Sequence, residues 1–236
     1  MSRKKPSRTI DSYVAKLVTA RNPKSPVSEA YRTIRTNIEF SGIDQKIKTL
    51  LVTSSVPTEG KSTVVANLGV SMAMSGKRTL IIDADLRNPT QFKCFNITTM
   101  LGLTNLLLDD SLTLDEVIAC PEQENLFILT SGPTPPNPAE LLGSAKMKSM
   151  VSAMADHFDL VLIDSPPVLA VADSSILSSF VDGVILVAAS GGVSKDHVLS
   201  AKEQLQKVKA NVLGVILNKV PTGNGSYYYS YYYGSH

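Results

Sequence analysis

The sequence predicts a single α/β domain in which a parallel sheet carries helices on both faces. Short apolar runs alternate with helix-like segments along most of the 236 residues, and this alternation is typical of a parallel sheet. Runs such as DLVLID and DGVILVA are apolar at nearly every position, as expected for strands that are covered on both faces. With 43% hydrophobic residues, the chain can bury a sizeable core.

Residues 1–24 differ from the rest of the chain in charge. They carry seven basic side chains and one acidic one, so this segment has a charge of +6 and the remainder has −4. We expect a flexible basic leader, which either stays solvated or lies against an anionic membrane surface or an acidic partner. Because the body is mildly acidic and shows no known nucleic-acid-binding motif, no nucleic acid is expected as a partner.

The expected domain covers residues 25–220 and begins with a helix. Ser25 is a favourable N-cap, Pro26 suits the first turn, and apolar residues recur at helical spacing from Val27 to Ile38. The expected strands are Thr49–Thr53, Thr79–Asp83, Leu126–Thr130, Leu160–Asp164, Gly183–Ala188 and Val212–Asn218. The expected helices among them are Lys61–Ser75, Thr104–Leu108, Leu114–Ala119, Pro138–Gly143, Lys146–Asp156, Ser174–Phe180 and Lys195–Val208.

A phosphate-binding loop is expected after the first strand, in SSVPTEGKST. The loop matches the pattern G-x-x-x-x-G-K-[ST] except that Ser55 stands at the first glycine. Backbone N–H groups and a helix N-terminus would surround the phosphates, Lys61 would reach the terminal ones, and the Ser62 hydroxyl would bind Mg²⁺. The alternative is a turn rich in serine and glycine with a surface lysine. The predicted nucleotide contacts here are Ser55, Thr58, Glu59, Gly60, Lys61, Ser62 and Thr63.

Two acidic motifs follow later strands. LIIDADLRNP places Asp83 at the end of one strand with Asp85 two residues on, and LVLIDSPP places Asp164 at the end of another. Open α/β sheets bind ligands at these strand ends, and carboxylates beside a triphosphate need a metal ion or a proton to offset their repulsion. One of them could accept a proton from an attacking hydroxyl, and Asp164 would lie in the outer shell of the metal. Each aspartate could instead cap a helix that follows its strand.

The last strand and the C-terminus add two further features. Asn218 ends the last strand, where P-loop proteins often recognise the base, so it is a candidate contact of adenine. Residues 221–236 have no aliphatic residue among their tyrosines, glycines and serines, and we expect a mobile tail. This tail holds six of the eight tyrosines: Tyr227, Tyr228, Tyr229, Tyr231, Tyr232 and Tyr233.

Taken together, SSVPTEGKS, LIIDADLR, LVLIDSPP and the tyrosine-rich tail resemble the bacterial tyrosine kinases that regulate capsule and exopolysaccharide synthesis. The chain is most similar to the separate cytoplasmic kinase subunit of Gram-positive type, over nearly its whole length, including SGPTPPNPAELL and SEAYRTIRTNIEF. The resemblance implies a P-loop NTPase-like fold and the cofactors ATP and Mg²⁺. It also implies that Lys61 and Ser62 bind phosphate and metal, that Asp83 takes the proton of the tyrosine hydroxyl, that Asp85 assists the metal site, and that Asp164 is the Walker-B-type carboxylate.

The resemblance further implies a homo-oligomeric ring in which the tail of one subunit enters the active site of its neighbour. The interface motif E-x-x-R-x-x-R of the family is matched by Glu29, Arg32 and Arg35. The six tail tyrosines would then be the sites of autophosphorylation. Judged from spacing alone, the three motif residues could equally form an exposed helix face held by ion pairs.

We therefore expect an ATP-dependent protein tyrosine kinase that autophosphorylates its tail, acts on other cytosolic proteins and regulates capsular or exopolysaccharide synthesis. The resemblance implies activation by a transmembrane adaptor, so we expect a cytoplasmic protein held at the inner face of the membrane through that adaptor. One alternative is a partition-type switch ATPase. It is disfavoured because Val56 occupies the place of the extra signature lysine of those ATPases. The other alternative, a non-catalytic nucleotide-binding scaffold, is disfavoured by Asp83 in the position of a base.

Overall fold

A computed structural model describes residues 13–14, 16–42 and 46–221 of the chain. Residues 1–12 and residue 15 of the predicted basic leader lie outside the described residues. The tail from residue 222 onward, with all six candidate acceptor tyrosines, also lies outside them. Within the described part of the chain, no helix is both long enough and apolar enough to span a membrane.

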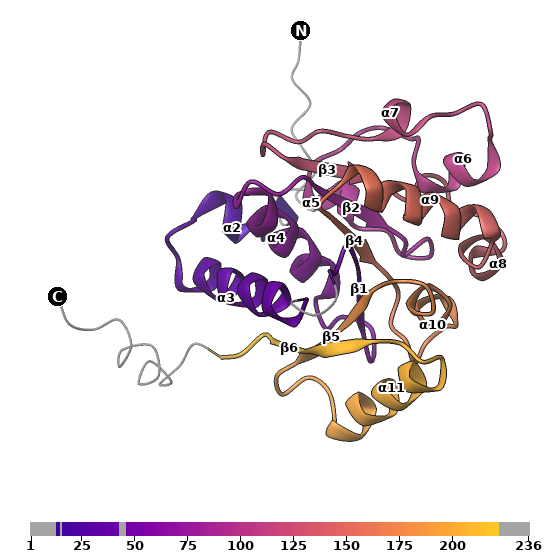
Figure 1. Ribbon diagram of the computed structural model, residues 1–236. Helices are drawn as coiled ribbons and strands as arrows, with labels where there is room; N and C mark the ends of the chain where they lie inside the picture. The colour runs from indigo at the N-terminus through magenta and orange to yellow at the C-terminus, as the bar shows by residue number, and fades with distance from the viewer. Residues whose placement is uncertain (1–12, 15, 43–45, 222–236) are drawn as a thin grey trace, which may run out of the picture.

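Six parallel strands form one sheet, as predicted (Figure 1). The strands are β1 (Thr49–Ser54), β2 (Thr79–Asp83), β3 (Leu126–Leu129), β4 (Leu160–Asp164), β5 (Gly183–Ala189) and β6 (Val212–Asn218), in the order β3-β2-β4-β1-β5-β6. In the register of this sheet, Asp164 of β4 lies beside Val52 of β1 on one side and Asp83 of β2 on the other. The topology therefore gathers the phosphate loop and both acidic motifs at one edge.

Helices cover both faces of the sheet, which confirms the predicted fold class (Figure 1). The first face carries α2 (Val18–Arg21), α3 (Pro26–Ser41) and α4 (Lys61–Ala73). The second carries α6 (Leu103–Leu108), α7 (Leu114–Val117), α8 (Pro138–Leu142), α9 (Ala145–His157), α10 (Asp173–Ser178) and α11 (Lys195–Lys207). The short helix α5 (Gln91–Cys94) follows β2 near the N-terminal end of α4.

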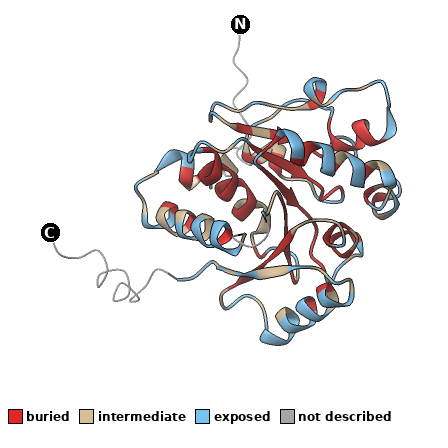
Figure 2. Cartoon of the chain, in the orientation of Figure 1, coloured by how far each residue is buried: buried red, intermediate tan, exposed pale blue. Residues whose placement is uncertain are grey.

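The core consists of two apolar layers that the sheet separates. On the central strand β1, Leu50 and Val52 face the layer under α3 and α4, and Leu51 faces the layer under the other helices. Burial is greatest along the central strands and declines toward β6 at the edge (Figure 2). On β6, Val215 is 55% exposed and Leu217 is 60% exposed. The near-continuous apolar composition of β1, β2, β4 and β5 thus reflects burial on both faces.

The helix α3 begins as predicted, with the Ser25 hydroxyl accepting a hydrogen bond from the N–H of Ser28 at 3.1 Å. Tyr31 and Ile38 are buried, whereas Val27 is 45% exposed. The predicted apolar stripe therefore does not include Val27, because in the first turn of α3 the buried side is occupied by Ser28, whose hydroxyl donates to the carbonyl oxygen of Asn22.

Residues 16–24 of the predicted leader contact the domain through α4. The backbone N–H of Thr19 donates to Asn67 Oδ1 at 3.0 Å, and Asn67 Nδ2 donates to the carbonyl oxygen of Lys16 at 2.9 Å. Thr19 is buried, and Leu17 packs against Ala66 of α4. This segment has too few apolar residues to show helical spacing, and its order comes from tertiary contacts with α4.

Asp182, just before β5, anchors the start of the central strand. Its Oδ2 accepts hydrogen bonds from the backbone N–H groups of Lys48 and Thr49, at 2.9 and 2.8 Å, and from the Thr49 hydroxyl at 2.9 Å. We expect Asp182→Ala to lower the free energy of unfolding by about 2 kcal/mol, because these donors lose a charged acceptor. Urea denaturation measures the loss.

The matched control is Asp182→Asn, which keeps one acceptor oxygen at the same place. We expect a smaller loss for the asparagine variant than for the alanine variant. Equal stability of wild type and Asp182→Ala would contradict the anchoring role.

Candidate active site

The phosphate loop joins β1 to α4 through a sharp turn in which two residues have positive φ. Thr58 has φ +67° and Gly60 has φ +90°, in the left-handed region. A Cβ on residue 60 would also lie 2.3 Å from Asn218 Nδ2, so only glycine fits there. No side chain caps the first turn of α4, which leaves its backbone N–H groups available to an anion.

The serine at the first glycine position of the pattern is compatible with this turn. Ser55 is not among the described residues with positive φ, so a side chain causes no backbone strain there. Ser55 is fully buried, and its hydroxyl has no hydrogen-bond partner within the described chain. The departure from the usual motif therefore leaves the loop conformation intact.

Three contacts from outside the loop hold it in place. Glu59 is only 2% exposed, and its carboxylate accepts from the N–H of Val56 at 2.8 Å and of Ala189 at 3.1 Å. Asn218 Nδ2 donates to the carbonyl oxygen of Glu59 at 2.9 Å, and Lys219 Nζ donates to that of Thr58 at 2.6 Å. The side chains of Glu59 and Asn218, both predicted as nucleotide contacts, thus bind the backbone of the loop in this structure.

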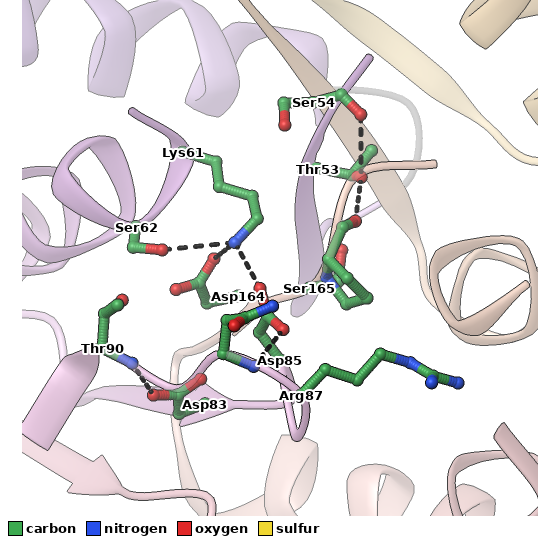
Figure 3. A network of polar contacts seen from close by, with 12 residues as sticks. Thr53, Ser54, Lys61, Ser62, Asp83, Asp85, Arg87, Thr90, Asp164 and Ser165 are labelled. Atoms are coloured by element: carbon green, nitrogen blue, oxygen red, sulfur yellow. Dashed lines mark hydrogen bonds and ion pairs between the residues drawn. The ribbon is translucent and has the colours of Figure 1, made fainter. Parts of the chain in front are cut away.

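Lys61 lies among the predicted acidic residues (Figure 3). Its ammonium nitrogen is 2.8 Å from Asp85 Oδ2, 3.5 Å from Asp164 Oδ1 and 3.3 Å from the Ser62 hydroxyl. Burial by itself would lower the pKa of Lys61, but the carboxylates of Asp164 and Asp85 outweigh this effect and raise it. The structure therefore brings together Lys61, Ser62, Asp85 and Asp164, which come from three separate segments.

Asp83 lies at the end of β2 and is completely buried. Its Oδ2 accepts hydrogen bonds from the backbone N–H groups of Thr90 and Gln91, both at 2.9 Å, and its Oδ1 has no hydrogen-bond partner within the described residues. Burial, followed by the nearby charge of Asp164, raises the pKa of Asp83 to about 8. Asp83 thus has a proton affinity near that of a general base that works at neutral pH.

These residues suit a magnesium ion that arrives together with phosphates. Lys61 pairs with Asp85 and Asp164, and the Oδ1 atoms of Asp83 and Asp164 are buried without hydrogen-bond partners in the described chain. No three His, Cys, Asp or Glu side chains of the described residues form a metal cage by themselves. Mg²⁺ is usually held by one or two carboxylates and by substrate phosphates, so no such cage is required.

Two residues near these carboxylates were not predicted as site residues. Gln91 of α5 is fully buried and lies beside Asp83 and Asp164. Arg87 forms a two-point ion pair with buried Asp173, Nε to Oδ2 at 2.9 Å and Nη2 to Oδ1 at 3.1 Å, which fastens the loop after β2 to α10. No sequence pattern predicted the contact of Gln91 with Asp164 or that of Arg87 with Asp173, because the two residues of each pair are distant in the chain.

The three residues of the predicted interface motif all have partners within the subunit. Glu29 and Arg32 form an ion pair on α3, and Arg32 Nη2 also donates to the carbonyl oxygen of Pro23 at 2.5 Å. Arg35 Nη1 donates to the carbonyl oxygen of Ser71 on α4 at 2.9 Å. Glu29 and Arg32 are more than one-third exposed, so they remain accessible to a neighbour, whereas Arg35 joins α3 to α4.

Comparison with known proteins assigns the chain to a family. Residues 48–213 match the family model described as an AAA domain. The chain is 46% identical to the tyrosine-protein kinase YwqD of Bacillus subtilis over 86% of this chain and 85% of the relative. It is 40% identical to the tyrosine-protein kinase CpsD of Streptococcus agalactiae over 84% of this chain and 86% of the relative. The chain belongs to the bacterial tyrosine-protein kinase family. This confirms the resemblance found in the sequence.

Solved structures agree with membership in the tyrosine-protein kinase family. The kinase domain of the Escherichia coli tyrosine kinase ETK matches with a TM-score of 0.83 and 31% identity, over 93% of this chain and 83% of that one. The chimerical protein CapA2B2 matches with a TM-score of 0.84 and 41% identity, over 88% and 91% of the two chains. The septum site-determining protein MinD of Pyrococcus horikoshii, in complex with Mg-ADP, shares the fold at 22% identity and a TM-score of 0.62. This P-loop NTPase-like fold implies nucleotide binding, typically with Mg²⁺.

The buried position of Asp83 gives a prediction for the pH dependence of stability. With a pKa of about 8 in the native state and an ordinary value of 3.8 when unfolded, Asp83 releases its proton on unfolding throughout the interval between them. The free energy of unfolding therefore falls as pH rises through that interval, and the contribution of this group levels off above it. We expect the free energy of unfolding of Asp83→Asn, relative to that of wild type, to increase as pH rises from 3.8 to about 8.

Urea denaturation of the nucleotide-free protein at several pH values measures this difference. Asp159→Asn is a suitable control, because Asp159 accepts an exposed hydrogen bond from the N–H of Arg78 far from the site. A difference between Asp83→Asn and wild type that stays constant with pH would contradict the raised pKa.

Proposed function

We propose that this chain is an ATP- and Mg²⁺-dependent protein tyrosine kinase that phosphorylates its own C-terminal tyrosines. The observation that carries this proposal is a buried carboxylate of raised pKa, Asp83, placed beside a phosphate loop and its lysine. The names of the relatives support the same activity. A switch ATPase needs a group that orients water, whereas a kinase needs one that accepts the proton of a hydroxyl.

The proposed reaction is direct transfer of the γ-phosphoryl group from ATP to a tyrosine oxygen. The phenol has an ordinary pKa of about 10, so it needs a base at neutral pH. Asp83 would take the phenolic proton through its free Oδ1 as the oxygen–phosphorus bond forms and the bond to ADP breaks. Lys61 would leave Asp85 and bind the phosphates, which uncovers the carboxylates for the incoming substrates.

The backbone of the loop and the N-terminus of α4 would hold the phosphates in line with the acceptor. Ser62, Asp85 and Asp164 would hold Mg²⁺. When bound, this ion would neutralise charge on the β- and γ-phosphates. Asn218 would lie near the base, in addition to its contact with the loop.

The proposed acceptors are Tyr227, Tyr228, Tyr229, Tyr231, Tyr232 and Tyr233 of a neighbouring subunit in a ring. The proposal includes a transmembrane adaptor as activator, a position at the inner face of the membrane through that adaptor, and other cytosolic proteins as substrates. It also includes a role in capsular or exopolysaccharide synthesis. Support for these points comes from the resemblance of the motifs, of the tail and of Glu29, Arg32 and Arg35 to the family pattern.

The first test is the intact mass of the protein after incubation with Mg·ATP and an adaptor fragment. We expect stepwise additions of phosphate to wild type, mapped to the tail, because the base and the acceptors are both present. We expect no additions to Asp83→Asn, which lacks the base, or to a chain that ends at Ser226. ATP turnover by wild type without added mass would instead favour a switch ATPase, and nucleotide binding without turnover would favour a scaffold.

A second test concerns the ring. Each tyrosine phosphate adds roughly −1.5 to −2 charges, so we expect phosphorylated protein to form smaller assemblies than unphosphorylated protein in light scattering. We also expect Arg32→Ala to reduce the size of the assembly. The control is Lys77→Ala, which removes another exposed ion pair of α3, the one with Glu39, without touching the motif. Equal sizes for all four samples would argue against the proposed interface.

A further inference from the structure

Gln91 contacts Asp83, Asp164 and the first turn of α4 at once. Its backbone N–H donates to Asp83 Oδ2 at 2.9 Å. Its side-chain Nε2 donates to Asp164 Oδ2 at 2.8 Å and to the carbonyl oxygen of Ser62 at 3.1 Å. Gln91 is 0% exposed. One buried residue therefore links β2, β4 and the first turn of α4.

The contacts of Gln91 are selective for one oxygen of each carboxylate. They occupy the Oδ2 atoms of Asp83 and Asp164, while both Oδ1 atoms are buried and have no hydrogen-bond partner in the described chain. The Oδ1 atom of Asp164 is the one that lies 3.5 Å from the ammonium of Lys61. A carboxylate held at one oxygen presents the other in a defined direction.

We propose that Gln91 is a positioning residue that orients the metal-side oxygen of Asp164 and the proton-accepting oxygen of Asp83 toward a common nucleotide site. This inference rests on the proposed function for the role of Asp83, and on the fold alone for the role of Asp164. Partners that orient metal-binding groups are known to affect metal affinity or activity by about 10- to 100-fold.

The chemistry of the glutamine side chain is required for this role. An amide offers two N–H donors, and here both have acceptors, Asp164 and the carbonyl of Ser62. A methionine of similar length would fill the space without donating, so Asp164 could rotate. A glutamate would place a third carboxylate beside Asp83 and Asp164 and would offer an acceptor where a donor is needed.

The test is the affinity of the full chain for a fluorescent ATP analogue, measured with Mg²⁺ and with EDTA. Wild type should bind more tightly with Mg²⁺. We expect Gln91→Met and Gln91→Glu to lose about 10- to 100-fold of this gain. The gain is the ratio of the affinities with Mg²⁺ and with EDTA, so an effect on the contact with Ser62 that is common to both conditions cancels. Tyrosine phosphorylation should fall in parallel.

The matched control is Cys94→Ala. Cys94 is buried in the same short helix and packs against Leu17 and Ala66, and among the described residues its thiol makes no hydrogen bond to Asp83 or Asp164. This variant shows the effect of destabilising α5 while Gln91 is kept. We expect Mg²⁺ to increase its affinity for the ATP analogue as much as it does for wild type. A full Mg²⁺ gain in both Gln91 variants, or an equal loss in Cys94→Ala, would overturn the inference.

A double variant, Gln91→Met with Asp164→Asn, tests the inference even if a single variant is less stable than wild type. In an Asp164→Asn background the Mg²⁺ gain is already reduced, and we expect Gln91→Met to reduce it no further, because both changes act through one carboxylate. Additive losses would overturn the inference. The measurement of binding does not depend on kinase activity. If wild type binds Mg·ATP but does not phosphorylate tyrosine, the proposed function is contradicted. The role of Gln91 is then still tested by the binding measurements.

Discussion

The electrostatic balance between one lysine and three buried aspartates is the constraint on which the rest of this structure depends. Burial and the nearby charge of Asp164 raise the pKa of Asp83 to about 8, and the carboxylates of Asp164 and Asp85 raise the pKa of Lys61. Such a cluster costs folding free energy and is maintained only by a rigid frame. The parallel sheet provides that frame, because it places the ends of β1, β2 and β4 side by side.

Several side chains outside the aspartate cluster hold the cluster and the phosphate loop in place. The carboxylate of Glu59 fastens the loop to the end of β5, and Asn218 and Lys219 fasten it to the end of β6. Gln91 holds Asp83 and Asp164 in place by hydrogen bonds. Side chains predicted as ligands therefore act, in this structure, as supports for the backbone groups and carboxylates that would bind the ligand.

The helix α4 connects the site to the surface where subunits are proposed to meet. Its N-terminus carries Lys61 and Ser62, and further along its length Ser71 accepts a hydrogen bond from Arg35 of α3. The interface motif on α3 thus lies one helix away from the phosphate loop. A ring contact made through α3 would therefore lie next to α4, the helix whose N-terminus is proposed to bind the phosphates.

The sequence by itself determined the six strands, to within one residue at their ends, and the edge of the sheet where Lys61, Ser62, Asp83, Asp85 and Asp164 meet. It could do so because buried parallel strands are nearly all apolar and the phosphate loop has a local pattern. Only the tertiary structure showed that α2 is an ordered helix packed on α4. It alone also showed the contacts of Gln91, the ion pair of Arg87 with Asp173 and the direction in which the Glu59 carboxylate points. These depend on hydrogen bonds between segments far apart in the chain, such as Asn67 with Thr19 and Gln91 with Asp164, and no local pattern encodes which distant group will satisfy a buried donor.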